Sequence, residues 1–124
     1  ENERKYKEEM TIENIINELK LKVFAGKDLL NRAVKGAYTS DLLSDVMGKA
    51  REGEVWITLQ THKNIIAVAS LKDLAAILIV NGGKPDENTL SAAASEGVVV
   101  LGTDERSFTI CGKLYKLMER DAVV

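Results

Sequence analysis

Two short runs of consecutive apolar residues constrain the fold of this chain more than any other feature. They are AAILIV, residues 75–80, and VVVL, residues 98–101. A strand with one face in water alternates apolar and polar residues, whereas an unbroken apolar run is covered on both faces. Stretches with helical spacing separate such runs, which indicates right-handed β-α-β units. The sequence therefore predicts an α/β fold of three layers, a mostly parallel sheet flanked by helices.

The remaining elements follow from apolar spacing and from residues that can cap helices. Ile12, Ile15 and Leu19 recur at helical spacing after Thr11, whose hydroxyl can accept from the free amides of a first turn. Residues 31–40 read as an irregular or short-strand passage. The predicted strands cover residues 21–25, 54–60, 75–81 and 98–102, and the predicted helices begin at Thr11, at Thr39 or Ser40, at Thr61, at Asp86, and at Thr103 or Asp104.

Helix ends and buried helix faces can also be predicted. A helix often ends at a residue in the left-handed conformation, which glycine adopts most easily, so Gly53 and Gly97 are expected to end the second and fourth helices. The predicted buried face of the second helix is Leu42, Leu43, Val46, Met47 and Ala50, and that of the last helix is Phe108, Cys111, Leu114, Tyr115 and Met118.

Composition and charge exclude several classes of protein. The 124 residues carry 17 basic and 19 acidic side chains, so we expect no general attraction to nucleic acid or to an anionic membrane. No apolar run reaches the roughly 18 residues of a membrane span, and the start ENERKYKEEM is too charged for a signal peptide, so we expect a cytoplasmic protein. We predict a single domain over residues 11–120, between a charged lead-in at 1–10 and a tail at 121–124.

The segment VNGGKPD, residues 80–86, raises the question of phosphate binding. A Walker A loop needs G-x-x-x-x-G-K-[ST], because its amides wrap the phosphates and its hydroxyl holds magnesium. Here the upstream glycine is missing and Pro85 stands where Ser or Thr is required. This excludes a P-loop kinase and favours a plain strand-to-helix turn. The other reading is a modest anion site at a helix N-terminus, with Lys84 nearby.

Nucleophilic catalysis and metal binding find little support. His62 is the only histidine, and Cys111, the only cysteine, lies on an apolar stripe where a thiol packs as a small hydrophobe. Asp41 and Asp45 are four residues apart and resemble a carboxylate pair, but they lie on the predicted wet side of their helix. No metal-ligand spacing occurs, and the sequence does not identify a cofactor.

Polar and flexible residues instead follow each predicted strand. In a parallel sheet, ligands bind beyond the carboxyl ends of the strands, where loops meet helix N-termini. Free amides at several helix starts would favour a small anionic metabolite or a nucleotide. The same residue types would also be expected if they only capped the helices. The candidate ligand-binding residues at this edge are Thr39, Ser40, Asp41, Gln60, Thr61, His62, Asn81, Gly82, Gly83, Lys84 and Thr103.

The stretch from Ala25 to Phe108 resembles a DRTGG domain. The motif that names this family aligns with NRAVKG, residues 31–36, where Arg32 and a glycine match, Asn31 replaces the acid, and the run is one residue longer. The segments SDLLSDVM and GEVWITLQTHKNIIAVASLKDLAAILIV carry the rest of the resemblance. It implies a fold like the N-terminal domain of HPr kinase/phosphorylase and a regulatory role, and it adds Arg32 to the candidate ligand-binding residues.

Three functional hypotheses follow. The first is a non-catalytic regulatory module that senses a small anionic metabolite or nucleotide at the carboxyl edge. The second is a structural adaptor or oligomerisation module, forming a homodimer or binding a partner enzyme, which exposed Val34, Tyr38 or Val98–Val100 would favour. The third is a small enzyme, with His62 as a general base beside a hydroxyl such as that of Thr39, Ser40 or Thr61.

Overall fold

The computed structural model describes residues 9–122, with side chains described up to residue 119. Residues 1–8 of the predicted lead-in and residues 123–124 of the predicted tail lie outside the described residues. The elements in chain order are α2 (Ile12–Leu19), β1 (Lys22–Ala25), the 3₁₀ helix η1 (Lys27–Leu29), β2 (Gly36–Thr39), α3 (Leu43–Lys49), β3 (Glu54–Thr58), α4 (Asn64–Leu71), β4 (Ala76–Ile79), α5 (Glu87–Glu96), β5 (Val100–Gly102) and α6 (Ser107–Ala122).

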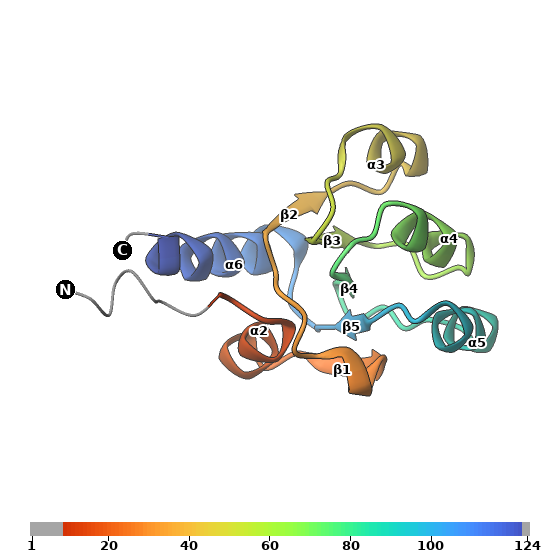
Figure 1. Ribbon diagram of the computed structural model, residues 1–124, viewed down its shortest axis with the longest axis horizontal. Helices are drawn as coiled ribbons and strands as arrows, with labels where there is room; N and C mark the ends of the chain where they lie inside the picture. The colour runs from red at the N-terminus through yellow and green to blue at the C-terminus, as the bar shows by residue number, and fades with distance from the viewer. Residues whose placement is uncertain (1–8, 123–124) are drawn as a thin grey trace.

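The strands form one sheet in the order β1-β5-β4-β3-β2. Strands β2, β3, β4 and β5 are parallel to their neighbours, whereas β1 pairs with β5 in the antiparallel direction. Helices α2 and α6 cover one face of the sheet, and α3, α4 and α5 cover the other (Figure 1). The predicted three-layer α/β fold with a mostly parallel sheet is therefore confirmed.

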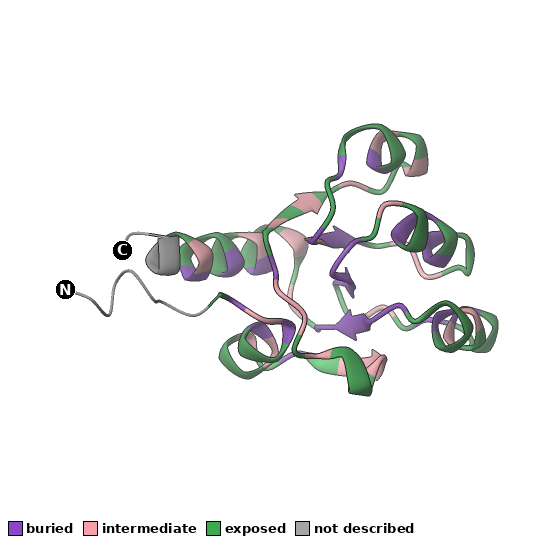
Figure 2. Cartoon of the chain, in the orientation of Figure 1, coloured by how far each residue is buried: buried purple, intermediate pink, exposed green. Residues whose placement is uncertain are grey.

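The hydrophobic core has two parts, one on each face of the sheet. Residues of the central strands alternate between them: Val55 and Ile57 face α2 and α6, while Trp56 faces α3 and α4. Strands β3, β4 and β5 are buried almost throughout, whereas β2 and β1 at the edges are not (Figure 2). This is the double coverage that the unbroken apolar runs predicted.

The predicted buried face of α6 is right for Leu114, and for Cys111 and Met118, which pack half-buried against the core, but it is wrong for the two aromatic residues. Phe108 is 91% exposed and Tyr115 is 67% exposed, while Ile110, Leu114 and Leu117 make the buried stripe. Positions 110, 114 and 117 are spaced by four and three, which satisfies helical periodicity as well as the predicted set does. Periodicity left two faces available, and packing against α2 and the sheet selected the one without the aromatic residues.

Helix α3 is shorter than predicted, and several predicted helix ends are displaced. It begins at Leu43, so Leu42 is 64% exposed and Met47 is 38% exposed, and it ends with Ala50 and not Gly53 as its C-cap. Gly53 instead lies in the turn before β3, with φ of 83°.

Three of the predicted caps are confirmed. Thr11 accepts from the amide of Asn14, Asp86 caps α5, and Gly97 ends α5 in the left-handed conformation, all as predicted. Thr61 does not cap α4, whose N-cap is Lys63, and α6 begins at Ser107, after the predicted Thr103 or Asp104. Asp104 instead pairs with Lys22 of β1, and Thr103 Oγ1 accepts from the amide of Glu105 within its own turn.

Candidate functional site

Four strand-to-helix turns meet at one edge of the sheet. Because β5, β4, β3 and β2 are parallel neighbours, their carboxyl ends lie side by side. The register places Thr39 opposite Ile57, Thr58 opposite Ile79, and Ile79 opposite Gly102. We call the residues of these turns, 39–42, 59–63, 80–86 and 103–106, the carboxyl rim. The structure thus brings every predicted site residue except Arg32 to this rim.

Asp41 ties the turn after β2 to the turn after β3. Its Oδ1 accepts from the hydroxyl of Thr58 and from the amide of Leu59, both at 2.8 Å. Gln60 donates from Nε2 to the carbonyl oxygen of Asp41 at 2.9 Å. Asp41 is therefore an acceptor for a neighbouring strand end, and Gln60 is held in the same network.

The glycine turn has no free amides at its centre. Asn81 donates to the carbonyl oxygen of Glu105 at 2.8 Å, Gly82 to that of Thr103 at 3.0 Å, and Gly83 to that of Val80 at 3.2 Å. The φ angles of Asn81 and Gly82 are 63° and 76°, which turn the chain sharply. The expectation that unpaired amides gather here is wrong, because these amides bind the next loop. The plain-turn reading of this segment is the one that the geometry supports.

The start of α5 already holds a carboxylate. Asp86 Oδ1 accepts from the amide and the hydroxyl of Thr89, each at 2.9 Å, and these bonds lower the pKa of Asp86 from its ordinary value of 3.8. His62 Nδ1 lies 3.4 Å from Asp86 Oδ2, and the His62 side chain is 75% exposed. An anion at this helix start would meet the charge of Asp86.

The hydroxyls that could pair with His62 have other contacts. Ser40 Oγ accepts from the amide of Leu42 at 3.1 Å, and Thr39 Oγ1 lies 3.2 Å from Cys111 Sγ. Thr103 Oγ1 accepts from the amide of Glu105. Over the described residues, the hydrogen bonds join His62 to the carboxylate of Asp86 and to no hydroxyl, that of Thr61 included.

Asp45 does not form a carboxylate pair with Asp41. Its Oδ2 accepts from the hydroxyl of Tyr38 at 2.8 Å, whereas Asp41 accepts from Thr58 and Leu59. The hydrogen bond from the Tyr38 hydroxyl, with a further one from Ser40, lowers the pKa of Asp45, and the same bond to Asp45 raises the pKa of Tyr38.

Arg32 lies at the opposite end of the sheet from the rim. Its Nη1 donates to the carbonyl oxygen of Leu74 at 2.9 Å and its Nη2 to that of Asp73 at 2.7 Å, just before β4 begins. Since the carboxyl rim follows the other end of β4, Arg32 cannot share a ligand with the predicted rim residues.

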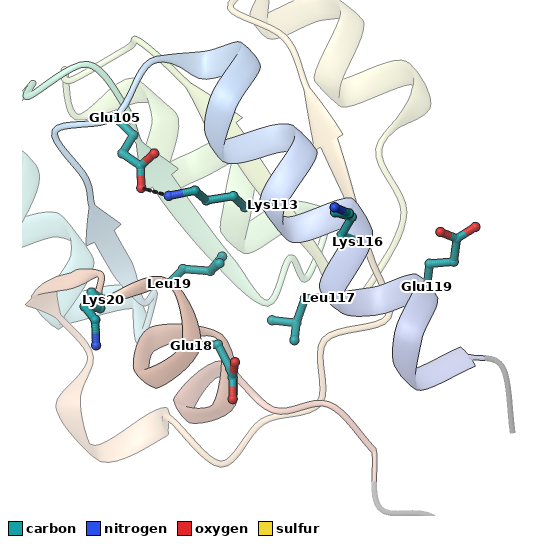
Figure 3. Close-up of a pocket in the computed structure, with 8 residues that line it drawn as sticks. All are labelled: Glu18, Leu19, Lys20, Glu105, Lys113, Lys116, Leu117 and Glu119. Atoms are coloured by element: carbon teal, nitrogen blue, oxygen red, sulfur yellow. Dashed lines mark hydrogen bonds and ion pairs between the residues drawn. The ribbon is translucent and has the colours of Figure 1, made fainter.

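A cavity of about 710 Å³ lies between α2 and α6, beside the β5 end of the rim. Sequence reasoning missed it, because no local pattern reports that α2 and α6 lie on the same face. In Figure 3, Leu19 and Leu117 point into the gap between the helices, and Lys113 reaches Glu105 of the rim at 2.8 Å. The lining residues are Glu18, Leu19, Lys20, Glu105, Lys113, Lys116, Leu117 and Glu119.

Among the side chains of residues 9–119, no group of three or more His, Cys, Asp and Glu is arranged to hold a metal ion. None of the helices within residues 9–122 is long and apolar enough to cross a bilayer.

The chain was compared with protein families, curated proteins and solved structures. No curated protein matches. The crystal structure of the CBS and DRTGG domains of the regulatory region of Clostridium perfringens pyrophosphatase, in complex with its activator diadenosine tetraphosphate, matches with a TM-score of 0.66 and 16% identity. The match covers 82% of this chain and 44% of that one, so this chain spans less than half of that regulatory region. The family model described as DRTGG domain matches residues 14–117, and the chain therefore belongs to the DRTGG domain family.

Proposed function

We propose that this chain is a non-catalytic regulatory module that senses a phosphate-bearing nucleotide or a similar anionic metabolite beside the carboxyl rim. The observation that carries this proposal is the cavity between α2 and α6, which Lys20, Lys113 and Lys116 line together with Leu19 and Leu117, among others. The regulatory region of similar fold was solved with a dinucleotide activator, which supports a nucleotide as the class of ligand.

The charges of the cavity favour a nucleotide over free phosphate. Lys20, Lys113 and Lys116 line it together with three glutamates, so a small anion gains little from the net charge. Lys113 is bound to Glu105, and a phosphate group would have to take the place of that carboxylate. A base or sugar against Leu19 and Leu117 adds the apolar contact that inorganic phosphate lacks.

We propose that the module is not catalytic because of what surrounds His62. A general base must reach the proton that it removes, and His62 Nδ1 faces the carboxylate of Asp86. The neighbouring hydroxyls of Thr39 and Ser40 contact Cys111 and a backbone amide. This arrangement leaves no nucleophile and base in contact within the described residues.

The adaptor hypothesis finds no support at the apolar residues that the sequence suggested for it. Val34 is 5% exposed, and Val98, Val99 and Val100 are at most 6% exposed. Tyr38 is half-buried and bonded to Asp45. The four valines serve the core, so any surface for another protein has to involve other residues.

Ligand titration followed by thermal unfolding tests the proposal. Adenine and guanine nucleotides, dinucleoside polyphosphates and inorganic phosphate are each added to the protein. A ligand at about 100 times its Kd stabilises a protein by about 2.7 kcal/mol, which raises Tm by several degrees for a chain of this size. We expect a saturable increase with at least one nucleotide and none with inorganic phosphate.

Variants then locate the binding site. The double variant Lys20→Gln, Lys116→Gln is expected to weaken nucleotide binding about tenfold or more, since it removes two lysines of the cavity. Lys27→Gln, an exposed lysine of η1 away from the cavity, is the matched control and should bind as the wild type does. Lys84→Gln tests the glycine turn as an alternative site. Loss of binding in Lys84→Gln but not in the double variant would contradict the cavity, and no stabilisation by any nucleotide would contradict the sensing function.

A further inference from the structure

The two edges of the sheet differ in a way that concerns association with other chains. At one edge, β1 is interrupted by an irregularity in register between Val23 and Ala25 and carries Lys22, which pairs with Asp104. Bulges and edge lysines are features that prevent further strand pairing. At the other edge, β2 runs in regular register with β3 from Gly36 to Thr39. Only the β2 edge thus offers an unbroken ladder to another strand.

The hydrogen-bonding groups of β2 that face outward can be assigned from its ladder. Ser40 donates its amide to the carbonyl oxygen of Ile57 in β3. Alternate residues of a strand bond to the same side, so Tyr38 also faces β3, and Ala37 and Thr39 direct their N–H and C=O groups away from the sheet. Both residues are exposed, and their side chains are small. Another strand can therefore approach β2 closely.

An apolar groove runs beside this edge, between β2 and α6. It has a volume of about 580 Å³ and is lined by Ala37 and Thr39 from β2 and by Leu114, Tyr115 and Met118 from α6, among others. Tyr115 is 67% exposed on the side of α6 that borders the groove. A chain that pairs with β2 would cover the groove and the aromatic ring together.

We propose that a second copy of this chain occupies this edge, with the two β2 strands paired antiparallel about a twofold axis at Tyr38. This is the one symmetric register in which Ala37 of each copy faces Thr39 of the other, so all the outward groups of both strands are bonded. The same register places Lys35 of one copy opposite Asp41 of the other. Both residues are exposed and opposite in charge. Lys35 Nζ already lies 3.8 Å from Glu52 Oε2 of its own chain, so Asp41 of the other copy would be a second acid within its reach.

The charges favour a second copy over an unrelated extended peptide. Lys35 and Asp41 lie three residues before and three residues after Tyr38. An antiparallel partner strand places an acid opposite Lys35 and a base opposite Asp41 only if it carries the same two charges at the same spacing. A second Asp41 carboxyl oxygen, Oδ2, is available for this contact in addition to the Oδ1 that binds Thr58 and Leu59. Pairing would also place the two α6 helices on the same face of a continuous sheet, with each Tyr115 directed toward the shared seam.

Mass measurement in solution tests this proposal on the intact chain. Sedimentation equilibrium or light scattering should give twice the 13.6 kDa of one chain. Ala37→Pro removes an outward N–H of an edge strand, where proline is tolerated, and should weaken the dimer by about tenfold to a hundredfold. Lys35→Glu sets like charges opposite one another and should also weaken it, by about tenfold.

Lys22→Glu is the matched control for Lys35→Glu. Lys22 is likewise an exposed lysine near an acid, Asp104 at 3.4 Å, but it lies on β1 at the opposite edge of the sheet, so the dimer of this variant should be unchanged. A wild-type protein that stays monomeric at all concentrations overturns the proposal. A dimer that resists both Ala37→Pro and Lys35→Glu also overturns it, because the copies then meet on another surface. Far-ultraviolet circular dichroism confirms that each variant is folded, and Lys35→Glu decides the question if Ala37→Pro does not fold.

Discussion

Arg32 binds Asp73 through two different groups of the same residue. Nη2 of Arg32 donates to the carbonyl oxygen of Asp73 at 2.7 Å and lies 2.8 Å from its carboxylate Oδ1. Nη1 donates to the adjacent carbonyl oxygen, that of Leu74. The arginine of the family motif therefore holds the turn before β4 in place, at the amino end of the sheet.

Loss of this contact should lower stability without affecting ligand binding. Arg32→Lys keeps the charge but cannot present two donors in a planar fork, so one carbonyl oxygen loses its partner. We expect a loss of about 1–3 kcal/mol in the free energy of unfolding, measured by urea denaturation. Arg51→Lys, at an exposed arginine, should change it by less than about 0.5 kcal/mol. Equal stability of the two variants would show that the fork is not needed.

Two glycines should respond in opposite directions to alanine. A methyl group at Gly102, at the end of β5, would collide with the Phe24 ring, whereas one at Gly112 in α6 meets nothing within 4 Å. Gly102→Ala should cost about 1–3 kcal/mol, because the ring must move. Gly112→Ala should add up to about 1 kcal/mol, since alanine favours the helix. Thermal unfolding of both variants checks the sign of each effect, and a stabilised Gly102→Ala would show that Phe24 can move without strain.

The indole N–H of Trp56 should stabilise the protein through its hydrogen bond to the rim. It is fully buried, and its Nε1 donates to the carbonyl oxygen of Ser40 at 2.7 Å. Trp56→Phe leaves that oxygen without its donor and should cost about 1–3 kcal/mol, measured by urea denaturation with circular dichroism. Tyr115→Phe removes a hydroxyl from an exposed ring and should have an effect below about 0.5 kcal/mol. A neutral Trp56→Phe would mean that water can replace the indole donor.

Acid should destabilise the protein partly through Asp86. Hydrogen bonds from Thr89 lower its pKa in the folded state below the ordinary 3.8, so folding favours the charged form. This contribution is present above that ordinary value and is lost as pH falls through the folded pKa. Asparagine caps helices about as well as aspartate but does not titrate. We therefore expect Asp86→Asn to resemble the wild type at pH 7 and to lose less of its Tm between pH 5 and pH 2.

Asp86→Ala separates capping from titration. It removes the acceptor for the Thr89 amide, so its Tm should fall at pH 7 as well. If Asp86→Asn follows the wild-type dependence of Tm on pH, the acid sensitivity arises elsewhere. Asp45, whose pKa is also lowered by its bond from Tyr38, is then the next residue to substitute.

The sequence alone predicted the layers and most of the elements, because burial on both faces leaves an unbroken apolar run that can be read locally. The run at 75–80 contains β4, and the run at 98–101 leads into β5. Thr11, Asp86 and Gly97 cap helices as predicted. It also predicted that the turns after the parallel strands share one edge, since strand direction alone determines that.

Only the tertiary structure decided where the polar groups of those turns are bound. Asp41 and the amides of Asn81 and Gly82 each have a partner in a different loop, and no local pattern identifies such a partner. The same holds for the face of α6, which two sets of residues with equal periodicity could have supplied. Contacts between segments far apart in the chain also formed the lysine-lined cavity between α2 and α6 and left β2 at an open edge. Spacing along a chain specifies which residues can share a face, whereas the neighbour that covers that face is chosen by packing.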